Sequence, residues 1–250
     1  MKQYILIIFL LIFTFSCSSK KNIIYLQGSD EMFNKIEYAE NRIRVDDILK
    51  ITLNSEFQET IVEFRSSDAI SSSKDVYLLN GFQVNSDGYI SFPKLGSIYV
   101  LGKTITQLKS ELTSMLTDGG YFNDIHLDIK ILNSYFTILG EVNRPGKYDF
   151  LENNINIFEA IGIGGDLTIN GKRNDIKIIR NIGENTTVKT IDLTKDSIFN
   201  NTYFQIFPGD IIIVNPNTTR IKNAGIIGNS GTLISLLSFL ISSFIVLGNN

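Results

Sequence analysis

Residues 82–93 read FQVNSDGYISFP, and this stretch decides the character of the chain. Apolar and polar residues alternate on both sides of Asp87-Gly88, a pair favoured where a tight turn needs a positive φ. The pattern predicts a β-hairpin over residues 82–93, and the alternation continues over residues 95–102. Short antiparallel strands are therefore expected in this part of the chain.

A helix follows this predicted sheet. Thr104 is a good helix cap, and the apolar residues after it recur at helical spacing: Ile105, Leu108, Leu112, Met115 and Leu116. Residues 125–132 then alternate as a strand does, and so do residues 42–53 around a turn at Asp46-Asp47. Residues 54–80, rich in serine and acidic residues, are interpreted as a loop insertion. The whole region is predicted to be α+β.

The next part of the chain repeats this mixture of strands and a capped helix. Residues 135–150 predict a hairpin that turns at 144–146, and Asn156 is predicted to cap a short helix. Strands are expected over residues 176–179, 188–193 and 207–216. Residues 45–51 and 208–214 share an acidic turn before an apolar strand, which suggests two related α+β units in tandem.

The first residues have the layout of a secretion signal. Met1-Lys2 precedes an apolar run over residues 4–15, which is shorter than the ~20 residues that a spanning helix needs. Residues 13–17, Phe-Thr-Phe-Ser-Cys, resemble the lipobox of bacterial lipoproteins, although leucine is commoner three positions before the cysteine. We expect Cys17 to carry lipid as the first mature residue. A plain secretory signal with a chance cysteine is the alternative.

The last 28 residues, after Lys222, carry no charge. Residues 233–247 predict an amphipathic helix of roughly 22 Å, nearer to the thickness of the bacterial outer membrane than to that of an average bilayer. Small residues fall on one stripe of this helix: Gly231, Ser235, Ser238 and Ser242. Three interpretations remain open: packing between spanning helices, a ring of copies with serines around a watery pore, or a core helix of a soluble protein.

Composition excludes several classes of function. The 250 residues carry a net charge of −3, which gives no broad basic surface for nucleic acid. A single cysteine excludes an internal disulfide framework and a multi-cysteine metal cluster. His126, the only histidine, is expected on the polar side of its strand. Without a second histidine or a free cysteine, we expect no metal site, no cofactor and no enzymatic activity.

Two further motifs contain residue types that could carry chemistry. The adjacent Asp46-Asp47 could suggest acid–base work on sugars, but neighbours on a strand point to opposite faces, so turn and cap roles are expected. Residues 162–166, Gly-Ile-Gly-Gly-Asp, follow a predicted helix instead of joining a strand to one. A phosphate-binding loop is therefore not expected there.

Three of the predicted strand-and-turn motifs, in this order along the chain, resemble a known family. Residues 42–51 look like the opening strand of the polysaccharide export (poly-export) domain, and residues 84–104 look like its central signature. Residues 138–148, with Gly164-Gly165, are similar to a β-grasp module called the SLBB domain. The resemblance covers roughly residues 41–216. It implies an outer-membrane lipoprotein that exports capsular or extracellular polysaccharide as a ring of copies, usually an octamer.

The resemblance also implies partners and a layout. C-terminal helices of such rings build the outer-membrane pore, and an inner-membrane polysaccharide co-polymerase, often a tyrosine autokinase, meets the ring from below. This chain has one β-grasp module where larger relatives have two or more, which predicts a shorter periplasmic body. Its C-terminal helix is short and bears serines, so a partner barrel could complete the channel. We expect the following segments: signal peptide 1–16, lipid-anchored tether 17–40, poly-export domain 41–133, SLBB domain 134–216, linker 217–232 and membrane-spanning helix 233–247.

The sequence thus favours a lipid-anchored outer-membrane exporter whose body lies in the periplasm. Its expected partners are the exported polysaccharide, the co-polymerase, membrane lipid and further copies of itself. The alternative is a lipid-anchored periplasmic β-grasp module that binds a sugar or another soluble ligand.

Overall fold

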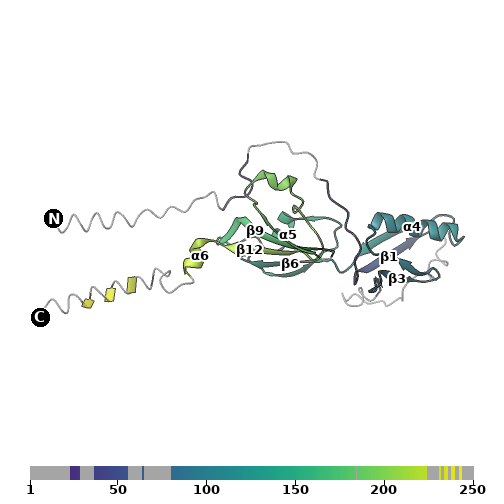
Figure 1. The fold of residues 1–250 in the computed structure, drawn as a ribbon, viewed down its shortest axis with the longest axis horizontal. Helices are drawn as coiled ribbons and strands as arrows, with labels where there is room; N and C mark the ends of the chain where they lie inside the picture. The colour runs from purple at the N-terminus through teal and green to yellow at the C-terminus, as the bar shows by residue number, and fades with distance from the viewer. Residues whose placement is uncertain are drawn as a thin grey trace.

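The computed structural model describes residues 23–28, 37–55, 64, 80–183 and 185–223, with positions 231, 234, 235, 238, 239, 242 and 243. Within them two bodies lie side by side along the long axis of the molecule, each with its own sheet and helix (Figure 1). Each body has its own cluster of buried apolar side chains, one spanning Ile43–Ile129 and the other Phe136–Val214. We call them the first and the second domain.

The first domain packs one helix against short strands. Its elements are β1 (Ile48–Asn54), β2 (Phe82–Gln83), β3 (Tyr89–Phe92), β4 (Gly96–Tyr99), α4 (Ile105–Asp118) and β5 (His126–Ile131). Strand β1 lies between β2 and β5, antiparallel to both, and β3 pairs with β4. Thr104 caps α4, as the sequence predicts, and the structure adds a reciprocal capping box with Gln107.

The hairpin expected over residues 82–93 is wrong in its pairing. Its turn exists, and Gly88 adopts a φ of 84°. However, β2 pairs with β1, whereas β3 pairs with β4 in a separate two-stranded sheet. The short connection from β3 to β4 places Ile90 directly opposite Ile98. Strand β3 therefore pairs with the strand that follows it in sequence and not with the one before it.

The second domain is built on a five-stranded sheet. Its elements are β6 (Tyr135–Gly140), β7 (Gly146–Asp149), β8 (Ile155–Asn156), α5 (Ile157–Ile163), β9 (Gly171–Ile182), β10 (Asn185–Ile191), the 3-10 helix η2 (Asp196–Asn200), β11 (Gln205–Ile206), β12 (Ile211–Pro216) and α6 (Thr218–Asn223). The strand order is β10-β9-β12-β6-β7, with β12 parallel to β6. Strands β8 and β11 form a small second sheet.

The mixed helix-and-strand class expected from the sequence is confirmed. The hairpin of β6 and β7 and the capped helix after Asn156 are also present. Strands β9 and β10 are longer than residues 176–179 and 188–193 suggested, because they pair with each other along seven positions. Among the described residues, no helix is long and apolar enough to cross a membrane. Most of the segment 233–247 lies outside the described residues.

The chain ahead of the first domain packs on the second domain. Leu26 and Gln27 donate backbone hydrogen bonds to the carbonyls of Leu193 and Thr194, at 3.1 and 2.7 Å. The Tyr25 hydroxyl donates to Asp166 at 2.5 Å, and burial together with this carboxylate raises the pKa of Tyr25. Residues 23–28 are therefore attached to the domain that follows the first one in sequence.

Candidate functional site

The first domain begins with a tight turn over residues 44–47. Asp46 adopts a φ of 66°, and the Asp47 carboxylate accepts a hydrogen bond of 2.8 Å from the Arg44 amide. Asp47 is only 7% exposed, and this burial raises the pKa of its carboxyl, while the bond from Arg44 opposes the shift. The pair Asp46-Asp47 thus has the turn and cap roles expected from the sequence.

The second domain contains a turn of the same construction over residues 207–210. Gly209 adopts a φ of 87° at the equivalent position, and the Asp210 carboxylate accepts from the Phe207 amide at 2.9 Å. The sequence echo between residues 45–51 and 208–214 therefore corresponds to one turn geometry used twice, each time directly before a strand.

These two turns contact each other across the domain boundary. The Arg44 guanidinium donates a hydrogen bond of 2.6 Å to the carbonyl oxygen of Pro208. A Cβ atom on Gly209 would lie 3.2 Å from Nη1 of Arg44, so glycine provides both the positive φ and the room for this approach.

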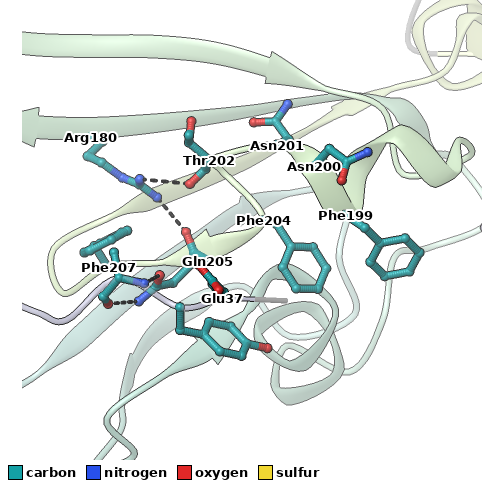
Figure 2. Close-up of a pocket in the computed structure, with 11 residues that line it drawn as sticks. Glu37, Arg180, Phe199, Asn200, Asn201, Thr202, Phe204, Gln205 and Phe207 are labelled. Atoms are coloured by element: carbon teal, nitrogen blue, oxygen red, sulfur yellow. Dashed lines mark hydrogen bonds between the residues drawn. The ribbon is translucent and has the colours of Figure 1, made fainter. Parts of the chain in front are cut away.

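Behind the second turn lies a buried ion pair. Arg180 donates to both carboxylate oxygens of Asp210, at 3.0 and 2.7 Å. It also donates to the carbonyls of Gln205 and Thr202, at 2.8 and 3.5 Å (Figure 2). Burial raises the pKa of Asp210, and the Arg180 guanidinium opposes the shift. The pair closes the base of the site without leaving a free charge.

Aromatic rings enclose the same guanidinium. The carbon of the Arg180 guanidinium lies 4.5 Å from the ring centroid of Tyr203 and 4.4 Å from that of Phe207. Such cation–π contacts fix the plane of the group.

A buried amide holds the chain that enters the first domain. The Gln205 side chain, 6% exposed, accepts from the Ala39 amide and donates to the Ala39 carbonyl, each at 2.8 Å. The amide side chain thus forms the same pair of hydrogen bonds to Ala39 that a residue of a neighbouring strand would form, one to the backbone N–H and one to the backbone C=O. Ala39 is thereby fastened to the second domain five residues before the turn at Arg44.

Two grooves open beside this fastened segment. The first, the linker groove, has a volume of about 700 Å³ and lies between Tyr38, Phe199, Phe204, Asn200 and Thr202. Figure 2 shows the side chains of Phe199, Phe204 and Asn200 beside one another in this groove. The second, the arginine groove, has about 590 Å³, and its walls include Arg42, Arg44, Leu101 and Ile182. Both volumes fall in the range of small-molecule sites.

The two grooves adjoin. Ala39, Arg180 and Phe207 line both of them. The seam between the domains therefore offers aromatic and amide groups on one side and guanidinium groups on the other.

The residues expected to act in the membrane are only partly described by the structure. Cys17 is outside the described residues. Gly231, Ser235, Ser238 and Ser242 are helical and exposed, and the Ser235 hydroxyl donates to the Gly231 carbonyl at 2.9 Å. Their role in packing or in a pore stays a prediction.

The other candidates from the sequence have plain structural positions. His126 is exposed at the start of β5. Gly164 caps the C-terminus of α5, so residues 162–166 lie at the helix end that does not attract anions. Within the described ranges, no group of three acidic, histidine or cysteine side chains is arranged to hold a metal ion.

The sequence interpretation missed the residues of the seam. Arg180 lies on the same strand face as the buried Ile176 and Ile178, because alternate residues of a strand share a face. This spacing alone indicated a buried charge that needs a partner. No comparable signal identified Gln205 or Arg44, whose partners lie more than 160 residues away in the chain.

Comparison with known families identifies the first domain. Residues 37–132 match the family model described as polysaccharide biosynthesis/export protein, in agreement with the resemblance seen in the sequence. This match supports a general role in polysaccharide export. The matched region begins at Glu37, so it includes the segment that Gln205 fastens and two of the three arginines of the arginine groove, Arg42 and Arg44.

Proposed function

We propose that this chain is a lipid-anchored component of an exporter of capsular or extracellular polysaccharide at the bacterial outer membrane. The observation that carries the proposal is the match of residues 37–132 to the polysaccharide biosynthesis/export family. We further propose that residues 134–216 are a single SLBB β-grasp module. A mixed sheet with β12 parallel to β6, next to the short helix α5, supports that assignment.

The positions of the two outer segments support attachment to one membrane. Tyr25 bonds to Asp166, and the Asn217 amide, at the start of α6, donates to the Asn170 carbonyl at 2.7 Å. Asp166 and Asn170 both belong to the loop between α5 and β9. The chain before the first domain and the chain after the second domain are thus fastened to the same loop.

The spacing along the chain fits this arrangement. Cys17 lies six residues before residue 23, a reach of at most roughly 20 Å for an extended chain. An acylated Cys17 and the C-terminal segment that follows α6 can therefore enter one bilayer from one end of the second domain. Two acyl chains suffice for stable anchoring.

The first domain then points away from that membrane. In Figure 1 helix α6 lies at the end of the second domain that is farthest from the first domain. With that end at the outer membrane, the first domain reaches into the periplasm, where an inner-membrane co-polymerase would meet it.

We propose that several copies form a ring, with the stripe of Gly231, Ser235, Ser238 and Ser242 facing either a watery lumen or the neighbouring helix. Small residues permit close helix packing, and hydroxyl groups hold a hydrated polymer less strongly than charges do.

The test of export starts from a deletion strain of the source bacterium. We expect surface polymer to be lost while polymer accumulates inside the cell, and the full chain to restore export. The variant Cys17→Ser should leave the protein unanchored and restore export poorly. Normal surface polymer in the deletion strain would contradict the proposal and favour the alternative of a lipid-anchored sugar-binding module.

The test of the stripe uses single cysteines at Ser235 or Ser238, with Leu240 on the opposite helix face as the matched control. A small, membrane-impermeant thiol reagent is applied to intact cells. Labelling at the serine positions but not at Leu240 is expected for a water-filled ring. Equal protection of both faces would contradict the lumen and leave helix packing.

A further inference from the structure

The arginine groove carries an unusual arrangement of cations. Arg42 and Arg44 flank Ile43, whose side chain is buried in the core of the first domain. Because side chains alternate along extended chain, burial of Ile43 turns Arg42 and Arg44 to the same outer side. Both are exposed, and both line the groove.

Each guanidinium is held in place by one backbone carbonyl. Arg42 donates to Gly102 of the first domain at 2.7 Å, and Arg44 donates to Pro208 of the second domain at 2.6 Å. A guanidinium has five N–H donors. Within the part of the chain that the structure describes, neither arginine forms a salt bridge, so donors remain for an anionic ligand.

The charge of this groove is positive although the chain as a whole is negative. Asp210 neutralises the third arginine, Arg180, at the base of the groove. One carboxylate, Glu40, also lines the groove, and it accepts a hydrogen bond from the Thr106 hydroxyl at 2.8 Å. Among the residues that line the groove, two guanidinium groups without an ion pair therefore face one carboxylate, in a chain whose net charge is −3. Arg44 also attracts the carboxylates of Asp47 and Asp210, which do not line the groove. A cleft of this kind concentrates anions.

The remaining walls are apolar. Leu101, Ile182, Phe207 and Pro208 line the groove, and Ile182 is 57% exposed. A ligand that satisfies both features combines an anionic group with an apolar C–H face. A sugar ring that bears a carboxylate has this combination, whereas a phosphate chain offers charge alone.

We propose that the arginine groove binds a carboxylate-bearing sugar unit, a uronic acid, of the exported polymer. The Arg42 and Arg44 guanidinium groups bind the carboxylate, and the sugar ring lies against Ile182 and Phe207. This inference rests on the proposed export function and names its substrate as an acidic polysaccharide.

The experiment measures binding to the full-length lipoprotein purified in detergent, with three probes. Oligogalacturonate is the acidic sugar, maltoheptaose is the neutral sugar, and polyphosphate is an anion without sugar rings. We expect binding of oligogalacturonate that weakens with salt, and much weaker binding of the other two. Binding of maltoheptaose or polyphosphate with equal affinity would overturn the proposal.

Variants locate the site. Arg42→Gln should weaken oligogalacturonate binding about tenfold or more, because a charge-assisted bond is lost. Arg42→Lys keeps the positive charge but lacks the planar guanidinium, so its affinity for oligogalacturonate should lie between those of the wild type and Arg42→Gln. Lys177→Gln, at an exposed position on β9 away from the groove, removes the same charge and should bind normally. Thermal melting verifies that each variant is folded, and unchanged binding by folded Arg42→Gln overturns the proposal.

Export is measured in the same variants so that the two proposals fail separately. If deletion of the gene abolishes surface polymer and folded Arg42→Gln still binds oligogalacturonate normally, only the groove assignment fails. If deletion leaves surface polymer unchanged, the export function itself fails.

Discussion

Arg44, in the opening turn of the first domain, donates a 2.6 Å hydrogen bond to the carbonyl oxygen of Pro208, in the last turn of the second. The two turns have the same construction, a positive φ followed by an aspartate that accepts from the backbone amide three residues earlier. A repeated local structure thus forms the contact between the domains. Two further interactions lie beside this contact. The Gln205 side chain accepts a hydrogen bond from the Ala39 amide, and Arg180 forms an ion pair with Asp210.

Removal of the Arg44 side chain should loosen this contact without unfolding either core. Arg44→Ala loses one hydrogen bond from a charged donor on an exposed residue, so we expect a loss of about 1 kcal/mol. Amide hydrogen exchange should accelerate at Phe207, Gly209 and Asp210, the positions of this turn that carry an amide hydrogen. Arg42→Ala is the matched control, because its bond to Gly102 stays within the first domain. Equal exchange at 207–210 in both variants would show that the bond does not couple the domains.

The buried pair of Arg180 and Asp210 should be costly to break on one side. Asp210→Asn leaves a buried guanidinium without its counter-charge, so we expect a loss of about 3–5 kcal/mol in urea unfolding. Asp175→Asn serves as the control, since its ion pair with Lys172 is about one-third exposed and spans 3.5 Å. That change should alter stability by less than about 0.5 kcal/mol. Similar losses in both variants would contradict the assigned role of the buried pair.

Gln205 should control the protection of the segment that enters the first domain. Gln205→Leu removes the acceptor for the Ala39 amide and the donor for its carbonyl, so this amide should exchange about tenfold faster. Gln205→Glu keeps an acceptor and should protect the amide partly. The Leu26 amide, bonded to the Leu193 carbonyl, is the internal reference. Unchanged exchange at Ala39 in Gln205→Leu would mean that other contacts hold the segment.

The sequence predicted local structure well because local rules determine it. The cap at Thr104 and the turn at Gly88 depend on residues within a few positions of each other. Which strands pair with each other was harder to predict from the sequence. Strand β12 pairs in parallel with β6, some seventy residues earlier, and nothing in the alternation of either strand names the other.

The same limit explains why the grooves were missed. They arise where residues 37–44 pass between the domains, so their walls come from four distant stretches of the chain. Arg180 was the one accessible signal, a charge on the buried face of a strand. The resemblance to the export family named a function for the first domain, but no motif in it points to the seam.

Two aspartates should respond to pH in opposite directions. Burial raises the pKa of Asp47, whose neighbours are Arg44 and Asp46. For Asp192, burial is outweighed by hydrogen bonds from Thr194 and by Lys195, and the pKa is lowered. A raised native pKa means that the folded state binds a proton more readily than the unfolded state. The contribution of this group to the free energy of unfolding therefore decreases as pH rises. A lowered native pKa means the reverse.

The variants Asp47→Asn and Asp192→Asn should therefore differ from the wild type with opposite signs at pH 7. Asp47→Asn keeps an acceptor for the Arg44 amide and removes a buried charge, so we expect it to be the more stable protein. Asp192→Asn should be less stable than wild type. The Asp47 difference should shrink as pH falls towards about 4, because the raised native pKa lets this carboxylate take up a proton early. The Asp192 difference should persist to about pH 4 and shrink only below it, as pH falls through the lowered native pKa. Urea unfolding at pH 7, 5, 4 and 3 measures the effect. Differences of the same sign, or differences independent of pH, would refute this assignment of the two carboxylates.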